Sequence, residues 1–100
     1  MSNAINEMRI EFHHKANARF VSIYTGFDRA VSNVSRRNEE FRFQRLKKQY
    51  ATVLEQELQM IAKDILIKHG NEKQVNEMGQ IFHHFIKDYL HRFVQKVNDL

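Results

Sequence analysis

The sequence predicts an all-α protein, a bundle of three long, nearly straight antiparallel helices that is completed by dimerisation. Two observations support this fold class. The 100 residues contain no proline and only three glycines, so the chain lacks the residues that sandwiches and barrels need at their many turns. The apolar residues recur at intervals of three and four in three separate series, which is the spacing of one face of an α-helix.

The first apolar series predicts a helix from Asn3 to Ser35. Its members share one helical face: Ile5, Met8, Phe12, Ala16, Phe20, Ile23, Phe27, Ala30 and Val34. Several of them recur every eleven residues, an interval of about 3.67 residues per turn that suits a nearly straight helix, whereas a strict heptad would impose a left-handed supercoil.

The second series predicts a helix from Asn38 to His69, again with one apolar face: Phe43, Leu46, Tyr50, Leu54, Leu58, Ile61 and Ile65. Between the two helices, Ser32, Asn33, Ser35 and Asn38 can each cap a helix end. Glu39 and Glu40 then suit the positive end of the next helix. No Gly or Pro enforces a corner there, so the alternative is one helix from Asn3 to His69, about 100 Å long. We favour the corner because a bent chain buries its apolar faces within one molecule.

The third series predicts a helix from Asn71 to Asp99, with these apolar members: Val75, Met78, Phe82, Ile86, Tyr89, Phe93, Val97 and Leu100. The corner before it is well marked. Gly70 follows a last turn that contains Lys68 and His69, and Asn71 precedes Gln74 by three residues, as in a capping box.

The third helix has more apolar surface than one bundle needs, since apolar residues cover over half of its circumference and a bundle helix uses only about a third. We therefore expect the excess to pack against a second copy, through Ile81, Phe85, Tyr89, Phe93 and Val97. The alternative is a helix buried at the centre of the monomer.

Two glycines lie inside predicted helices, Gly26 near the edge of the first apolar face and Gly79 within the apolar arc of the third helix. A glycine inside a helix costs about 1 kcal/mol relative to alanine. We expect each to be compensated by a close helix crossing.

Composition restricts the function classes. A chain of 100 residues forms one domain, residues 1–100. The absence of cysteine excludes disulfides, thiolate metal sites and a thiol nucleophile. The first residues do not resemble a signal peptide, and no apolar run approaches about eighteen residues. There is no Gly-rich phosphate loop and no serine nucleophile at a tight turn. We therefore expect a cytoplasmic protein that is not an enzyme, binds no cofactor and does not enter a membrane.

The charge of the chain is concentrated in one segment. Six cations lie in it, Arg36, Arg37, Arg42, Arg45, Lys47 and Lys48. With Glu39 and Glu40 the balance is +4, which equals the net charge of the whole chain. Such a segment, interleaved with Phe41 and Phe43, is typical of a surface that neutralises phosphates. The alternative is a solvated surface whose glutamates pair with neighbouring arginines at helical spacing. The cations point around most of the helix, which does not suit a groove-reading recognition helix.

A second polar cluster, His84, Asp88 and His91, falls on one side of the third helix. Imidazole and carboxylate at spacings of four and three can contribute ligands to one metal ion. Three ligands on one helix seldom converge without help from a neighbouring element. We therefore predict an exposed polar face here and no metal site.

Two hypotheses for function follow. The first is a small non-enzymatic helical regulator or accessory protein that contacts DNA or RNA phosphates through the basic segment. The second is a helical adaptor or inhibitor that binds another protein through exposed apolar helix faces. Salt dependence separates them, because phosphate contacts release counterions and apolar grooves mostly do not.

Overall fold

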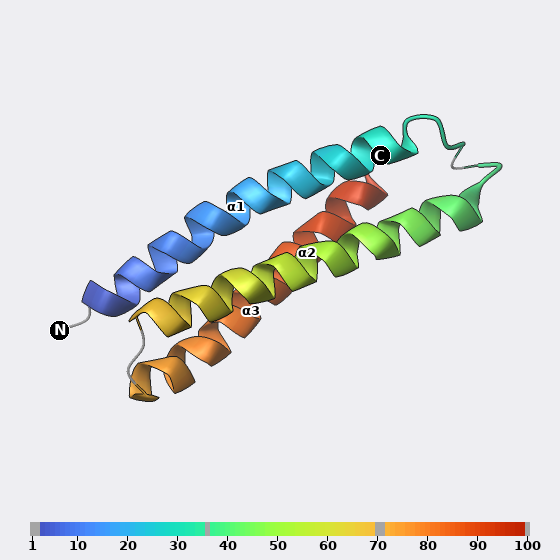
Figure 1. The fold of residues 1–100 in the computed structure, drawn as a ribbon. Helices are drawn as coiled ribbons and strands as arrows, with labels where there is room; N and C mark the ends of the chain where they lie inside the picture. Colours follow the sequence, from blue (N-terminus) through green and yellow to red (C-terminus); the bar gives the residue numbers. More distant parts are fainter. Residues whose placement is uncertain (1–2, 36, 70–71, 100) are drawn as a thin grey trace.

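The computed structural model describes residues 3–35, 37–69 and 72–99. It contains three helices, α1 (Asn3–Val31), α2 (Glu40–His69) and α3 (Glu72–Asn98). Consecutive helices run antiparallel in an elongated bundle (Figure 1) of 55 × 19 × 18 Å. The described residues contain no strand. The predicted all-α bundle of three helices is confirmed.

The corner between α1 and α2 is also confirmed, so the alternative of one helix from Asn3 to His69 is wrong. The Ser32 Oγ donates to the Arg29 carbonyl at 2.8 Å, and the Asn38 amide donates to the Ser35 Oγ at 3.2 Å. Local bonds of this kind compete with continuation of the helix. They explain why α1 ends at Val31 instead of Ser35 and why α2 begins at Glu40 instead of Asn38.

The corner between α2 and α3 was expected to rest on Gly70 and Asn71, which lie outside the described residues. The third helix begins at Glu72 and ends at Asn98, within one residue of the predicted ends at Asn71 and Asp99. Val75 and Leu100 of the third apolar series lie outside the described side chains. The remaining members of that series are buried.

The three apolar series face one another and form a single core. Its buried members are Met8, Phe12, Ala16, Phe27 and Val31 of α1, Phe43, Leu54, Leu58, Ala62 and Ile65 of α2, and Met78, Phe82, Ile86, Tyr89, Phe93 and Val97 of α3. The eleven-residue interval is visible in Phe43, Leu54 and Ile65, which all lie on the inner face of α2. Val34 lies beyond the end of α1 and is only partly buried.

Aromatic rings fill the space between α1 and α3. The rings of Phe12 and Phe82 are stacked with centroids 4.8 Å apart, and the rings of Phe27 and Phe93 meet edge to face at 5.7 Å. Such pairs add about 0.5–1.5 kcal/mol to the free energy of burial. The backbone of α1 lies closer to the backbone of α2 than to the backbone of α3. This is expected, because bulky rings separate α1 from α3.

The core accounts for much of the proposed dimer interface. Tyr89, Phe93 and Val97 are 3%, 0% and 0% exposed in the single chain. Ile81 and Phe85 are partly buried against the same core. Much of the apolar arc of α3 therefore packs within one chain.

The third helix is not buried at the centre of the monomer, because His84, Lys87 and His91 are exposed on its other side. Among the described side chains, the large exposed apolar ones lie on α1 and α2, so α3 offers less exposed apolar surface for a second copy than predicted. Dimerisation itself stays a prediction.

The two helical glycines differ in their surroundings. A Cβ added to Gly26 would lie 3.4 Å from Cε2 of Tyr50, so this glycine admits the close approach that was expected. A Cβ added to Gly79 would meet nothing within 4 Å among the described residues. The expected close crossing at Gly79 is therefore not found within the chain.

Replacing Phe93 by alanine should lower the free energy of unfolding by about 3–5 kcal/mol, because the ring is fully buried and its removal leaves a cavity. Urea denaturation followed by circular dichroism measures the change. Phe41→Ala is the matched control: its ring is 77% exposed, so its removal should change stability by less than about 0.5 kcal/mol. Equal losses in the two variants would contradict the described core.

Replacing Gly79 by alanine should raise the free energy of unfolding by about 1 kcal/mol, because alanine favours the helix and the added methyl group meets no neighbour. The gain for Gly26→Ala should be smaller, since its methyl group would touch the Tyr50 ring. Thermal denaturation of both variants measures the difference. A loss of stability in Gly79→Ala would show that other atoms occupy the space beside Gly79 and clash with the added methyl group.

Candidate nucleic-acid interface

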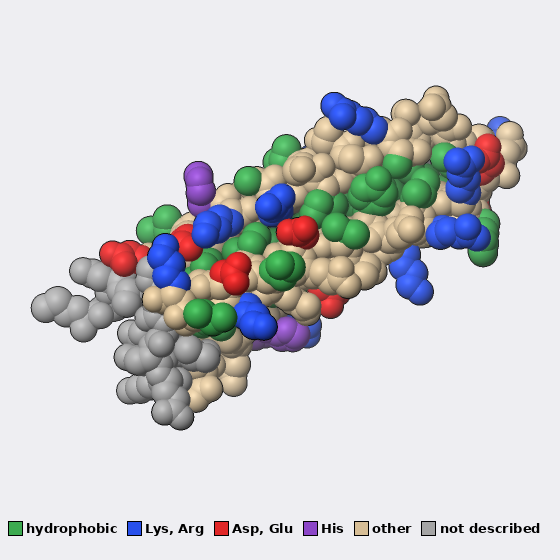
Figure 2. All heavy atoms as spheres, viewed as in Figure 1, with side chains coloured by type: hydrophobic (Ala, Val, Ile, Leu, Met, Phe, Trp, Pro, Cys, Tyr) green, Lys and Arg blue, Asp and Glu red, His purple; other side chains and the backbone are tan. Residues whose placement is uncertain are grey.

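The basic segment lies at the end of the bundle where α1 ends, α2 begins and α3 ends (Figure 1). We call its described cations the basic corner: Arg37, Arg42, Arg45, Lys47 and Lys48. Arg36 lies outside the described residues. On the face shown in Figure 2, Lys and Arg side chains outnumber acidic side chains at this end. The chain thus brings five of the six predicted residues to one end of the molecule.

The cations of the basic corner have different neighbours. Arg37 and Lys48 are exposed. The Arg42 Nη1 lies 3.3 Å from the Glu39 Oε2, which is one of the pairs expected for a solvated surface. The Lys47 Nζ donates to the Asn98 Oδ1 of α3 at 3.0 Å. Lys47 therefore links α2 to the end of α3 as well as adding charge.

Phe41 is the large apolar side chain on this surface. Its ring is 77% exposed, and the Arg45 guanidinium carbon lies 5.1 Å from the ring centroid. Phe41, Arg45 and Lys48 are spaced by four and three residues, so they share one outward face of α2. Arg42 is exposed on an adjacent face. The result is a cationic surface around an open aromatic ring, and not a single stripe of cations.

Phe43 does not belong to this surface, although the sequence places it among the cations. It is 3% exposed and its ring meets that of Phe27 edge to face at 5.7 Å. Phe43 follows Phe41 by two positions, which corresponds to a rotation of about 200° around a helix. Helical spacing therefore predicts that only one of the two rings can face outward, and the core takes Phe43.

The ion pair of Arg42 and Glu39 does not neutralise the basic corner. Both side chains are well exposed, at 68% and 41%. Exposed pairs contribute only about 0–1 kcal/mol and are screened by salt. Arg42 is therefore free to exchange Glu39 for a phosphate at small cost.

A polar network that the sequence did not predict crosses the α1/α3 interface. The Tyr89 hydroxyl donates to the Asn17 Oδ1 at 2.9 Å and lies 3.0 Å from the His13 Nδ1. With the tyrosine proton directed at Asn17, the Tyr89 oxygen can accept a hydrogen bond from the Nδ1–H tautomer of His13. The network satisfies the polar end of a tyrosine whose ring lies in the core, which buried hydroxyl groups require.

The environment of this network shifts two pKa values. Burial lowers the pKa of His13 below its ordinary value of 6.5, and the charges of Arg92 and Arg9 lower it further. Burial raises the pKa of Tyr89 above 10.0, while Arg92 acts in the opposite direction. His13 is therefore neutral and Tyr89 protonated near pH 7. The arrangement links α1 to α3 through the polar ends of side chains that flank the core.

The polar face of α3 brings no metal site together. His84, Asp88 and His91 are exposed. Within residues 3–35, 37–69 and 72–99, no three His, Asp or Glu side chains are placed to hold one metal ion. Over the same part of the chain, no helix is both long and apolar enough to cross a membrane.

Neither a family model nor a curated protein nor a solved structure matches this chain. The function of this chain must therefore be inferred from the surface of the bundle.

The pKa of His13 predicts a loss of stability in acid. The folded chain binds the His13 proton less tightly than the unfolded chain, so stability should fall as the pH is lowered through 6.5 toward the lower folded-state pKa. Melting temperatures between pH 7.5 and pH 5, at intervals of about half a unit, measure the slope. His13→Gln should reduce this slope, whereas His14→Gln, at an exposed neighbouring position, should leave it unchanged. An unaltered slope in His13→Gln would contradict the assignment.

Proposed function

We propose that the protein is a small non-enzymatic helical regulator or accessory protein that contacts the phosphates of DNA or RNA through the basic corner. The observation that supports this proposal best is the exposed ring of Phe41 among exposed cations. An isolated large apolar side chain on a charged surface has no role in the core. Beside arginine and lysine, it suits a ligand that presents both negative charge and flat apolar faces.

Single-stranded nucleic acid has that combination. Its phosphates attract cations, and its unpaired bases stack on aromatic rings with about 1–3 kcal/mol per base. Duplex DNA presents phosphates but keeps its bases stacked inside. The cations around Phe41 do not form the continuous stripe of a recognition helix that enters a groove. We therefore expect the basic corner to bind single strands more tightly than duplexes, with little preference for sequence.

Binding to single-stranded oligonucleotides should fall steeply with salt, because neutralised phosphates release counterions. The change to test is Arg42, Arg45 and Lys48 to Gln together. It should reduce the log–log salt slope by about 2, at roughly 0.7 for each phosphate of a single strand. Fluorescence anisotropy over a range of salt concentrations measures both affinity and slope.

The matched control replaces Arg9, Lys63 and Lys87 by Gln. These side chains are exposed, lie outside the basic corner and change the net charge by the same amount. This variant should bind almost as well as the unmodified protein. Equal weakening in the two variants would show that net charge alone governs binding. No binding to single strands, duplexes or structured RNA at low salt would remove the proposal.

Phe41→Ala separates stacking from phosphate contact. It should weaken single-strand binding by about 1–3 kcal/mol without altering the salt slope, because no charge is lost. Glu39→Gln with Glu40→Gln should strengthen binding, since both carboxylates repel phosphates. Binding to anionic lipid vesicles without binding to nucleic acid would assign the basic corner to lipid headgroups and contradict the proposal.

A further inference from the structure

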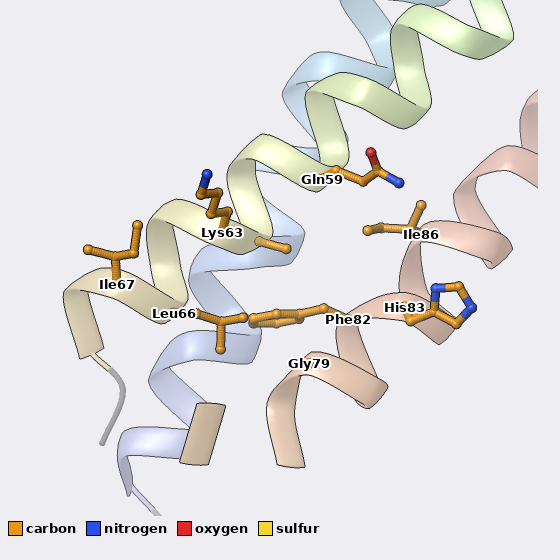
Figure 3. A pocket seen from close by; sticks show the side chains of 9 residues that line it. Gln59, Lys63, Leu66, Ile67, Gly79, Phe82, His83 and Ile86 are labelled. Atoms are coloured by element: carbon orange, nitrogen blue, oxygen red, sulfur yellow. The ribbon is translucent and has the colours of Figure 1, made fainter. Parts of the chain in front are cut away.

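An open apolar groove lies between α2 and α3, toward the end opposite the basic corner (Figure 3). Its volume is about 550 Å³. Apolar side chains form most of its lining, namely Ala62, Leu66 and Ile67 of α2 with Phe82 and Ile86 of α3. Figure 3 shows Leu66 extending toward Phe82 across the groove. Ile67, at its edge, is 73% exposed.

Gly79 lines this groove. It lies inside α3, where a glycine weakens the helix, and the chain places nothing within 4 Å of its missing Cβ among the described residues. The space beside Gly79 is therefore unused by the chain's own packing. A glycine in such a position allows the backbone of another helix to approach closely, as small residues do at helix crossings.

The charge around the groove is one-sided. Lys63 and His83 lie on its two rims, one on each helix (Figure 3), and Gln59 adds an amide. None of the described residues that line the groove is acidic. A ligand that places apolar groups on the floor and carboxylates at the rims would match this distribution.

The surface continues along α2. Val53, Met60 and Ile67 recur every seven residues and are all exposed, so they follow one side of the helix. A shallow depression lined by Gln56, Gln59, Met60 and Lys63 adjoins the groove. The groove itself spans residues 59–67 of α2, about 12 Å of helix, which is long enough for two turns of a ligand helix.

We propose that this groove binds an acidic amphipathic α-helix of another protein, with its apolar side chains between Leu66 and Phe82 and its carboxylates toward Lys63 and His83. Helices bind grooves in this way through apolar residues at spacings of three and four. A second copy of the chain fits less well, because its net charge of +4 does not complement the charge of Lys63 at the rim. The inference is independent of the proposed nucleic-acid contact, which uses other residues at the opposite end.

The test uses a fluorescein-labelled peptide of about 18 residues, roughly five helical turns, with Leu on one face and Glu on the other. A second peptide carries Lys in place of every Glu. Fluorescence anisotropy should show binding of the acidic peptide, and at least about tenfold weaker binding of the basic one. Amide chemical-shift changes should fall on residues 59–67 and 79–86. Equal affinity for the two peptides, or changes confined to the basic corner, would overturn the proposal.

Two pairs of variants locate the site. Gly79→Leu fills the open space and should weaken acidic-peptide binding at least about tenfold, whereas Gly26→Ala, at a position outside the groove, should leave it unchanged. Lys63→Glu should weaken binding, whereas the same charge reversal in Arg45→Glu at the basic corner should not. Circular dichroism checks that each variant is folded. If Gly79→Leu is unfolded, Gly79→Ala serves in its place, because its methyl group would meet nothing within 4 Å among the described residues.

Light scattering shows whether a second copy of the chain, instead of another protein, occupies the groove. The protein without peptide should be a monomer of about 12 kDa at micromolar concentration. A dimer that Gly79→Leu converts to a monomer would assign the groove to a second copy and overturn the proposal. Failure of peptide binding would leave the basic corner unaffected, and failure of nucleic-acid binding would leave the groove unaffected.

Discussion

The burial of the apolar arc of α3 against both other helices is the contact on which the bundle depends. α1 and α2 alone would pair through one face each and leave Phe12, Phe27, Leu58 and Ile65 partly open to water. The α3 residues Phe82, Tyr89 and Phe93 close that core, and their rings contact those of α1 directly. At about 25 cal/mol for each Å² of apolar surface removed from water, a few large rings contribute more than all of the exposed ion pairs.

This constraint also leaves the outward faces of the helices to polar and charged residues. Cations lie on all three helices, and they are densest at the α1/α2 corner and in the first turns of α2. The hydroxyl groups of Ser32 and Ser35 hold that corner. They start α2 at Glu40, which in turn directs Phe43 inward and Phe41, two residues earlier, outward. The position of the helix start therefore decides which aromatic ring the solvent meets.

Periodicity was sufficient to predict the fold. The three series of apolar residues and the inward direction of Phe43, Leu54 and Ile65 follow from intervals of three, four and eleven. The corner near Ser35 was predicted instead from its capping residues and from the need to bury the apolar faces within one molecule. Properties that depend on a partner helix could not be predicted in this way. The sequence indicates that Tyr89 lies on an apolar face, but the spacing along α3 cannot show that Asn17 and His13 of α1 satisfy its hydroxyl group. The breadth of the apolar arc likewise does not show whether the second surface it meets belongs to the same chain.

The same limit applies to the two candidate binding surfaces. The basic segment can be recognised from the sequence because its charged residues lie close together along the chain. The hydrogen bond from Lys47 to Asn98 cannot, because the two residues are far apart in the sequence. The groove combines residues of α2 and α3 whose spacing within each helix is ordinary. Only the packing shows that, among the described residues, no atom lies within 4 Å of a Cβ added at Gly79. Lys63 lies about 27 Å along α2 from Arg45, and the two share no contact. Distant sites without shared partners act additively. A nucleic acid bound at the proposed basic corner would therefore not alter the affinity of the proposed groove for a helix.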